Sequence, residues 1–325
     1  MKIFIKTFVY LIVLIPLKAY PQACCTGGAP LSSSLGIISY TGENLVIDFS
    51  YDFNTMKDLY AGTTQLNDKQ RERSTNSTIL RFSYALNNKW AITTVLPYVW
   101  QEQTVRSNVG KTVQSSSGIG DIVLLGQYAL MQNKKNLVLL AMGPKFPTGS
   151  ISKTDNEFGL LLPPDLQPGT GSWDGIGAVS YSRYGIFRPT LSLYTLFSYR
   201  YSFQVGRYDG QQKYRFGNEM VINIGLTDSF LLKKWILNPG LQFKYRNTQK
   251  DENNGSSFPN TGGSWMYLVP SLDIELTPKI YLHSNFEIPI HTDVVGTQLV
   301  TSFKGNIGIN YTLNFKKNRA YKIKD

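Results

Sequence analysis

Apolar and polar residues alternate along most of this chain, and this alternation restricts the possible folds more than any other feature. In the last alternating segment one face consists of Leu299, Thr301, Phe303, Gly305, Ile307, Ile309, Tyr311, Leu313 and Phe315. Its other face is polar, with residues such as Lys304, Asn306 and Asn310. Side chains of a β-strand point to its two sides in turn, so a period of two with one apolar face predicts a strand that borders a hydrophobic phase.

Twelve such segments follow one another through residues 43–315. They cover residues 43–54, 75–86, 90–100, 119–130, 137–147, 173–183, 189–204, 214–226, 235–246, 264–276, 279–290 and 299–315. Connections are long after every odd-numbered segment, as at 55–74 and 101–118, and short after every even-numbered one, as at 87–89. Bacterial outer-membrane barrels alternate long extracellular loops with short periplasmic turns in this way. The predicted fold class is therefore all-β, a transmembrane antiparallel β-barrel of about 12 strands in outer-membrane lipid.

The composition excludes other classes. The 325 residues are 42% hydrophobic and 17% charged. With a mean hydropathy of -0.18 the chain is too polar for a bundle of membrane helices. Of the net charge of +11, the first 23 residues contribute +3 and the last ten +4, so the body carries only +4 and we expect no nucleic-acid partner. Rings near segment ends, such as Trp90, Trp100 and Trp235, predict aromatic girdles at the membrane interfaces.

Both ends of the chain lie outside the predicted barrel. Residues 1–23 have lysines before an apolar core and a small residue at Ala23, which predicts a cleaved signal peptide. Residues 24–42 are rich in glycine and serine, and form either a plug inside the barrel or a periplasmic linker. Cys24 is lipidated after cleavage in one interpretation, and unmodified in the favoured one. The barrel spans 43–315, its terminal Phe315 suits the barrel-assembly machinery, and the basic residues 316–325 form a periplasmic tail.

The polar faces of the segments carry charges of both signs. The expected lumen-facing acids are Asp121, Glu219, Asp273 and Glu287, together with Asp48, Asp52, Asp174 and Glu275. The expected lumen-facing bases are Arg81, Lys145, Arg200, Arg215, Lys244 and Lys304, together with Arg246. Because the two signs nearly balance, we expect charges that pair across the lumen and stabilise the barrel, instead of a ring of one sign that selects ions.

Prolines interrupt several predicted strands. Those within the predicted segments are Pro97, Pro144, Pro189, Pro239, Pro270 and Pro289. Proline cannot donate a ladder hydrogen bond, so it is found at edges, bulges and bends of a sheet. Pro97 and Pro144, in the third and fifth segments, are the candidates for a kink in the wall that opens sideways to release a solute.

Three motifs between residues 118 and 174 resemble those of a known family. The positions that carry the resemblance are Gly118, Gly120 and Asp121 at a strand start, Pro147, Thr148 and Gly149 after Lys145 and Phe146, and Gly169 and Gly171 before Trp173. They are similar to the outer-membrane barrels of the meta-pathway of phenol degradation family, which are relatives of the long-chain fatty acid channel. The resemblance implies a transporter in the outer membrane of a Gram-negative bacterium for passive uptake of small hydrophobic or aromatic solutes.

Two other functions remain open. A structural or adhesive barrel without transport is the first alternative, and a barrel-embedded lipid hydrolase is the second. His283 and Ser284 are adjacent on a predicted strand and therefore point to opposite faces, where they cannot act as base and nucleophile. We expect no enzyme activity, no metal site and no cofactor, and the sequence does not indicate an oligomeric state.

Overall fold

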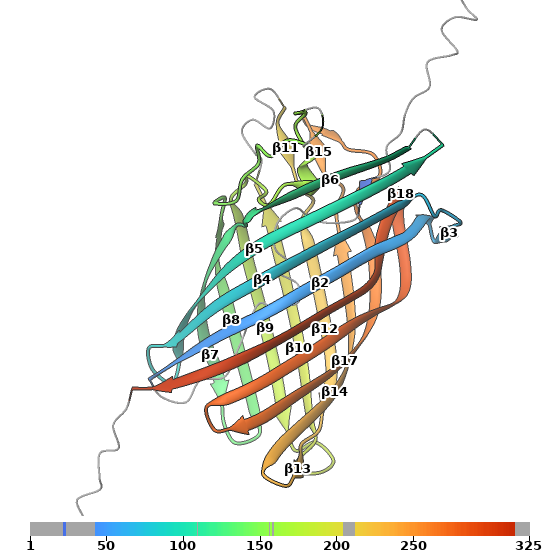
Figure 1. Cartoon of the computed structure of the whole chain (residues 1–325). Coiled ribbons are helices and arrows are strands. Elements are labelled where there is room, and N and C mark those ends of the chain that lie inside the picture. Colours follow the sequence, from blue (N-terminus) through green and yellow to red (C-terminus); the bar gives the residue numbers. More distant parts are fainter. Residues whose placement is uncertain are drawn as a thin grey trace, which may run out of the picture.

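A computed structural model describes residues 22–23, 43–108, 110–155, 157, 159–203 and 212–315. Most of them form one antiparallel sheet that closes into a barrel (Figure 1). The wall strands are β2 (Asn44–Gly62), β4 (Arg71–Ala85), β5 (Trp90–Ser107), β7 (Ile122–Gln132), β8 (Asn136–Phe146), β9 (Asp174–Tyr184), β10 (Ser192–Ser202), β12 (Glu219–Thr227), β14 (Trp235–Thr248), β17 (Gly263–Thr277) and β18 (Ile280–Asn314). Each pairs with the next, and β18 returns to pair with β2, which confirms the predicted closed barrel.

The element β18 supplies two wall strands because it folds back on itself. Its 35 residues would extend about 115 Å if straight, yet its first part pairs with β17 and its second part with β2. Phe286 and Phe303 stack with ring centroids 5.9 Å apart, so the two parts lie side by side. The chain reverses near Gly296, whose φ of 71° suits glycine. A long connection after the eleventh segment was expected here, and the continuous strand with a tight reversal corrects it.

Several strands extend beyond the predicted segments. β2 continues to Gly62, β5 continues to Ser107, and β6 (Gly110–Ile119) pairs with β5 where a long loop was expected. The short β3 (Thr64–Leu66) similarly occupies the connection expected at 55–74. Residues 101–107 of β5 and most of β6 are polar on both faces, so the alternation that marks a membrane-facing strand is lost there while backbone pairing continues. The 55–62 part of β2 instead keeps Met56 and Leu59 buried.

Shorter elements lie around the barrel. They are β1 (Gln22–Ala23), which pairs with β18, β13 (Phe230–Leu232), a 3-10 helix at Pro164–Leu166, and a separate sheet of β11 (Tyr214–Arg215), β15 (Glu252–Asn253) and β16 (Ser256–Ser257). Among the residues that the structure describes, no helix is long and apolar enough to cross a membrane. The proposed signal peptide, the plug at 24–42 and the tail at 316–325 lie outside the described residues, apart from residues 22–23.

The connections segregate by length between the two ends of the barrel (Figure 1). The short-turn end carries the connections at 86–89, 133–135, 185–191, 228–234 and 278–279. The long-loop end carries those at 147–173, 203–218 and 249–262, of which the second contains β11 and the third β15 and β16. Pro189 belongs to the turn at 185–191, so its predicted place within a strand is wrong.

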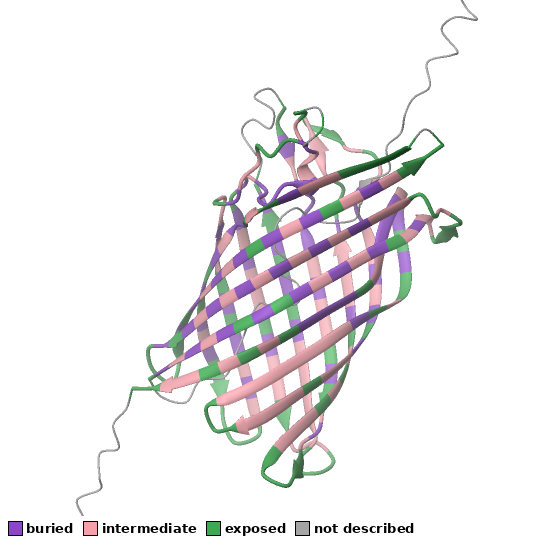
Figure 2. Ribbon diagram, in the orientation of Figure 1, coloured by how far each residue is buried: buried purple, intermediate pink, exposed green. Residues whose placement is uncertain are grey.

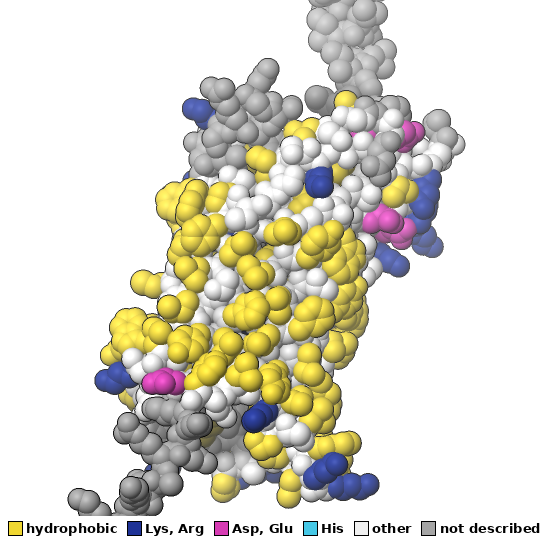
Figure 3. All heavy atoms as spheres, turned by 60° about the vertical axis from the view of Figure 1, so that its left-hand side comes forward, with side chains coloured by type: hydrophobic (Ala, Val, Ile, Leu, Met, Phe, Trp, Pro, Cys, Tyr) yellow, Lys and Arg dark blue, Asp and Glu magenta, His cyan; other side chains and the backbone are white. Residues whose placement is uncertain are grey.

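Burial alternates along the wall strands (Figure 2). On β2, Asp48, Ser50 and Asp52 are buried inside the barrel, whereas Phe49 and Tyr51 are exposed outside it. Hydrophobic side chains consequently cover the middle of the outer face, as Figure 3 shows. This arrangement exposes an apolar band to lipid and turns most polar groups towards the lumen.

Candidate functional site in the lumen and at its mouth

A chain of ion pairs, here called the ion-pair ladder, runs along the inner wall from β7 to β14. Its members in order are Asp121, Lys145, Asp174, Arg200, Glu219 and Arg246, and neighbours lie 2.6–3.6 Å apart. Paired strands hold their inward positions side by side, so an acid on one strand meets a base on the next. The charges therefore pair along the wall, where pairing across the lumen was expected.

Two further groups carry the charged inner surface around the rest of the barrel. They are Lys244, Glu287 and Lys304 on β14 and β18, and Arg81, Asp48 and His283 on β4, β2 and β18. Lys244 lies 2.9 Å from Glu287, and His283 Nε2 lies 2.7 Å from Asp48. Ser284 instead donates to the Leu272 carbonyl, so His283 and Ser284 have separate partners.

Two other expected lumen residues, Asp273 and Arg215, lie outside these groups. Asp273 is half-buried on β17, in register with His283 of β18. Arg215 lies in β11, above the wall, where it pairs with Glu252 at 3.3 Å and lies over the ring of Tyr201. The segment expected at 214–226 begins only at Glu219, so Arg215 does not face the lumen. Tyr214 and Phe216 flank Arg215 in the sequence and imitate the alternation of a wall strand, so the sequence gave no sign that the wall strand starts later.

The three motifs meet at one point beside the mouth, here called the motif cluster. Asp121 accepts hydrogen bonds from Lys145 Nζ at 2.6 Å, from Thr170 Oγ1 at 2.6 Å and from the Gly149 N–H at 3.0 Å. The backbones of Gly149 and Gly169 touch, and a Cβ on either would lie 2.5 Å from the other. The cluster thus ties both ends of the 147–173 connection to the start of β7 and the end of β8.

The 147–173 connection, here called the mouth loop, folds against the inside of the extended strands. Arg73 of β4 is fully buried and donates to the Asp165 carboxylate at 2.5 Å and to Gln101 at 2.7 Å. Gln101 in turn donates to the Gln167 carbonyl at 3.1 Å, and Ser116 donates to the Leu166 carbonyl. Sequence reasoning missed these residues, because Arg73 lies in a stretch interpreted as a loop.

Three clusters of apolar side chains, here called together the apolar track, lie on the inner faces of β4, β5, β7, β8 and β9. The track consists of Ile79, Val95, Val123, Leu125 and Ile176 at one level, and Ala85, Ala91, Ala129, Leu137 and Leu139 towards the short-turn end. All of these side chains are buried. A uniformly polar lumen was expected, although the apolar runs at 122–125 and 137–142 do not alternate and could have revealed it.

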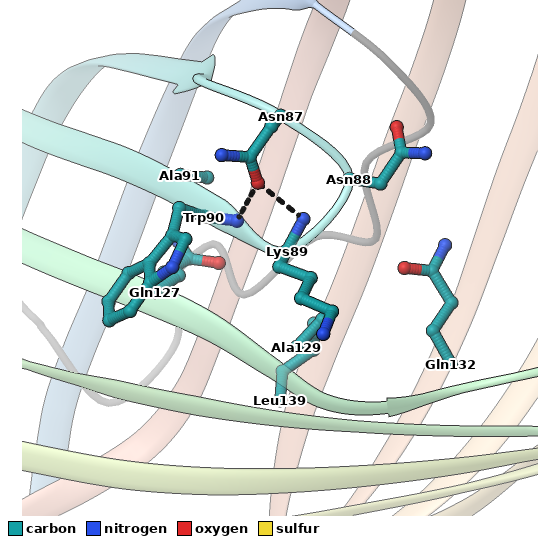
Figure 4. Close-up of a pocket in the computed structure, with 9 residues that line it drawn as sticks. All are labelled: Asn87, Asn88, Lys89, Trp90, Ala91, Gln127, Ala129, Gln132 and Leu139. Carbon is teal, nitrogen blue, oxygen red and sulfur yellow. Dashed lines mark hydrogen bonds between the residues drawn. The ribbon is translucent and has the colours of Figure 1, made fainter.

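A pocket lies where the apolar track reaches the short-turn end (Figure 4). Ala91, Ala129 and Leu139 form its apolar lining, and Lys89 and Gln132 add polar groups. The Asn87 side chain accepts hydrogen bonds from the backbone N–H groups of Lys89 and Trp90, at 2.8 and 2.9 Å, and so fixes the turn beside it. The track therefore ends at a small opening with a mixed lining.

Strand pairing is interrupted on both sides of β7. The partner of β5 changes from β6 to β7 at Pro97, whose carbonyl accepts from the Gly120 N–H at 2.9 Å. On the other side, β7 pairs with β8 at Val123↔Lys145 and next at Gly126↔Met142. The positions between these two pairs, which include Pro144, form a gap in the pairing of β7 with β8. A side chain at position 143 would collide with the Leu124 backbone, so glycine permits this close approach. Both kink candidates thus lie next to the same strand.

Above the mouth, a half-buried acid, Asp251, lies beside the β11, β15 and β16 sheet. Asp251 accepts hydrogen bonds from Tyr214 Oη at 2.5 Å and from the Gly217 N–H at 2.7 Å. Burial raises the pKa of Asp251 from 3.8 to about 6, although these two hydrogen bonds act in the opposite direction. This carboxyl group is the candidate for a titration that affects the loops.

The sequence profile of a family described as "Putative MetA-pathway of phenol degradation" matches residues 60–287, more than half of the chain. The chain belongs to this family. The structure is similar to that of an outer-membrane channel from Pseudomonas putida F1, with 13% identity and a TM-score of 0.65 over 84% of this chain and 96% of that one. At that identity the likeness shows the fold.

Weaker similarities reach two toluene transporters at 8% identity. They are TodX of Pseudomonas putida, with a TM-score of 0.37 over 90% of this chain and 96% of that one, and TbuX of Ralstonia pickettii, with 0.36 over 85% and 90%. TM-scores this low support no conclusion about the protein described here. Among curated proteins no sequence matches.

Proposed function

We propose that this chain is an outer-membrane channel for passive uptake of small hydrophobic or aromatic solutes in a Gram-negative bacterium. The proposal includes export through a cleaved signal peptide and no enzymatic step. The apolar track is the observation that carries it, because a lumen that only passed ions or sugars would gain nothing from buried Val123 and Leu125 on its wall. Membership of the family and the barrel fold support it.

In the proposed route, a solute enters at the long-loop end beside the mouth loop and moves along the apolar track. Release takes place next to β7, where Pro97 and Pro144 interrupt pairing with both neighbours. The ion-pair ladder borders the track. Its charges pair with one another, so these charges do not bind a neutral solute. No step requires a covalent bond to form or break.

Flux into reconstituted liposomes tests the proposal with a panel of aromatic compounds, fatty acids and sugars. We expect aromatic compounds to pass faster than sugars of similar size. The variant Leu125→Asn, which makes the track polar with the same branching and number of heavy side-chain atoms, should reduce aromatic flux while leaving sugar flux unchanged.

Leu299→Asn is the matched control, because Leu299 is an equally buried leucine that packs with Met56 and Leu59, away from the track. Absence of flux for every solute would favour the structural or adhesive alternative. A loss of aromatic flux in both variants would show that general destabilisation, and not the track, is responsible.

A further inference from the structure

The five connections at the short-turn end hold a positive charge that the proposed transport does not use. Each carries at least one cationic residue, and together they hold seven cations against one acid. The cations, here called the basic rim, are Lys89, Lys134, Lys135, Arg188, Lys233, Lys234 and Lys279, and all are exposed. The one acid, Asp228, is already paired with Arg188.

This charge belongs to one end of the barrel only. At the long-loop end, the described residues of the connections at 63–70, 147–173, 203–218 and 249–262 carry five cations against six acids. A general need for solubility would affect the connections at both ends alike. The basic rim therefore indicates a negatively charged neighbour at the short-turn end.

Exposed apolar side chains lie directly beside the basic rim. Phe187 and Leu231, in two neighbouring turns, are 90% and 75% exposed. The ring of Trp235 follows Lys234 along the chain, and the Lys234 Nζ lies 6.0 Å from its centroid. Figure 3 shows Lys and Arg side chains at this lower end and a second group at the upper right, where Asp and Glu side chains lie beside them. Rings, aliphatic tips and lysines in one belt are typical of a surface at the level of lipid headgroups.

We propose that the basic rim binds the headgroups of anionic glycerophospholipids, such as phosphatidylglycerol, in the leaflet around the short-turn end. The lysines attract the phosphodiester charge, as polybasic segments beside membranes do. Phe187 and Leu231 insert among the upper methylene groups of the acyl chains. The cations are distributed over five turns around the barrel, so several lipids bind at once. This interaction does not depend on which solute the lumen passes.

Tryptophan quenching by brominated lipids tests the proposal on the full chain. The protein is reconstituted in phosphatidylcholine vesicles with a minor fraction of either brominated phosphatidylglycerol or brominated phosphatidylcholine, and the Trp235 signal is obtained by difference from Trp235→Phe. We expect several-fold stronger quenching of Trp235 by the anionic lipid. The preference should weaken at high salt and disappear in the Lys233→Gln/Lys234→Gln variant.

The variant Lys153→Gln/Lys250→Gln removes the same charge at the long-loop end and should keep the preference. Heat-modifiable mobility in gels checks that each variant is folded. Equal quenching by the two lipids in the unaltered chain would overturn the proposal, as would a preference that survives Lys233→Gln/Lys234→Gln. Equal quenching together with rim-dependent binding to isolated peptidoglycan would assign the basic rim to the cell wall instead.

Discussion

The wall around β7 and β8 and the wall around β14 and β18 both have an apolar outer face. Their inner faces differ. On β7, Val123, Leu125 and Ala129 point inwards and are buried. On β14 and β18, the corresponding inner surface carries Lys244 and Glu287, paired at 2.9 Å. Contact with lipid requires an apolar outer face in both regions, so only their inner faces can differ. Both regions contain paired charges, since Lys145 of β8 pairs with Asp121, but only the first carries the apolar track.

The largest effect should come from removing a base from the ion-pair ladder. Lys145→Met leaves Asp121 buried without a cation and should lower the free energy of unfolding by about 3–5 kcal/mol. Lys244→Met should cost less, because Lys304 still lies 3.5 Å from Glu287. Urea unfolding in lipid vesicles measures both values, and equal losses would contradict the distinction between the two regions.

The next largest effect concerns the connections at the long-loop end of the barrel. Because the folded pKa of Asp251 is about 6, the proton stabilises the β11, β15 and β16 sheet below the unfolded pKa of 3.8, and this stability is lost as the pH rises through about 6. Hydrogen exchange of the backbone amides near Tyr214 should therefore accelerate between pH 4 and pH 7, by at most about a hundredfold.

Asp251→Asn should remove this pH dependence, since asparagine does not titrate. Exchange at the 133–135 turn, at the opposite end of the barrel, should follow only the intrinsic pH dependence of exchange. A similar additional acceleration at both places would place the titrating group elsewhere.

A smaller effect is expected from crowding the motif cluster. Gly169→Ala places a Cβ 2.5 Å from the Gly149 backbone and should destabilise the protein by about 1–3 kcal/mol. The displaced mouth loop should also raise single-channel conductance in a planar bilayer. Gly175→Ala, which meets no atom within 4 Å, is the control and should change neither property.

The smallest effect on stability should come from the prolines. Pro144→Val restores a backbone donor beside β7 and should raise the free energy of unfolding by about 1 kcal/mol, through one additional ladder hydrogen bond. If release takes place there, the uptake of aromatic solutes should slow. Pro270→Val makes the same change on β17, where the register also passes over the proline, from Leu268↔Ile288 to Ser271↔Asn285. Equal slowing in both variants would argue against release beside β7.

The parts of the fold that sequence reasoning predicted are those that contact lipid. Phe49 and Tyr51 alternate with Asp48 and Ser50 because the two faces of one strand meet different phases, and this pattern survives in the sequence. The extension of β5 was missed because both of its faces are polar, and that of β2 because Met56 and Leu59, three residues apart, break the period of two. The tight reversal at Gly296 was missed because nothing in its sequence distinguishes it from a longer loop.

The sequence by itself determined a closed barrel of about twelve strands, the segregation of short turns from long loops, and the family. A strand with lipid on one side must alternate, and only closure satisfies its edges. Only the tertiary structure decided which charges pair and which inner faces are apolar. It also brought Asp121, Gly149 and Thr170 together at the mouth, within hydrogen-bonding distance across 49 residues of sequence. Such partners come from different strands and a loop, so their meeting depends on register and closure, which no local pattern encodes.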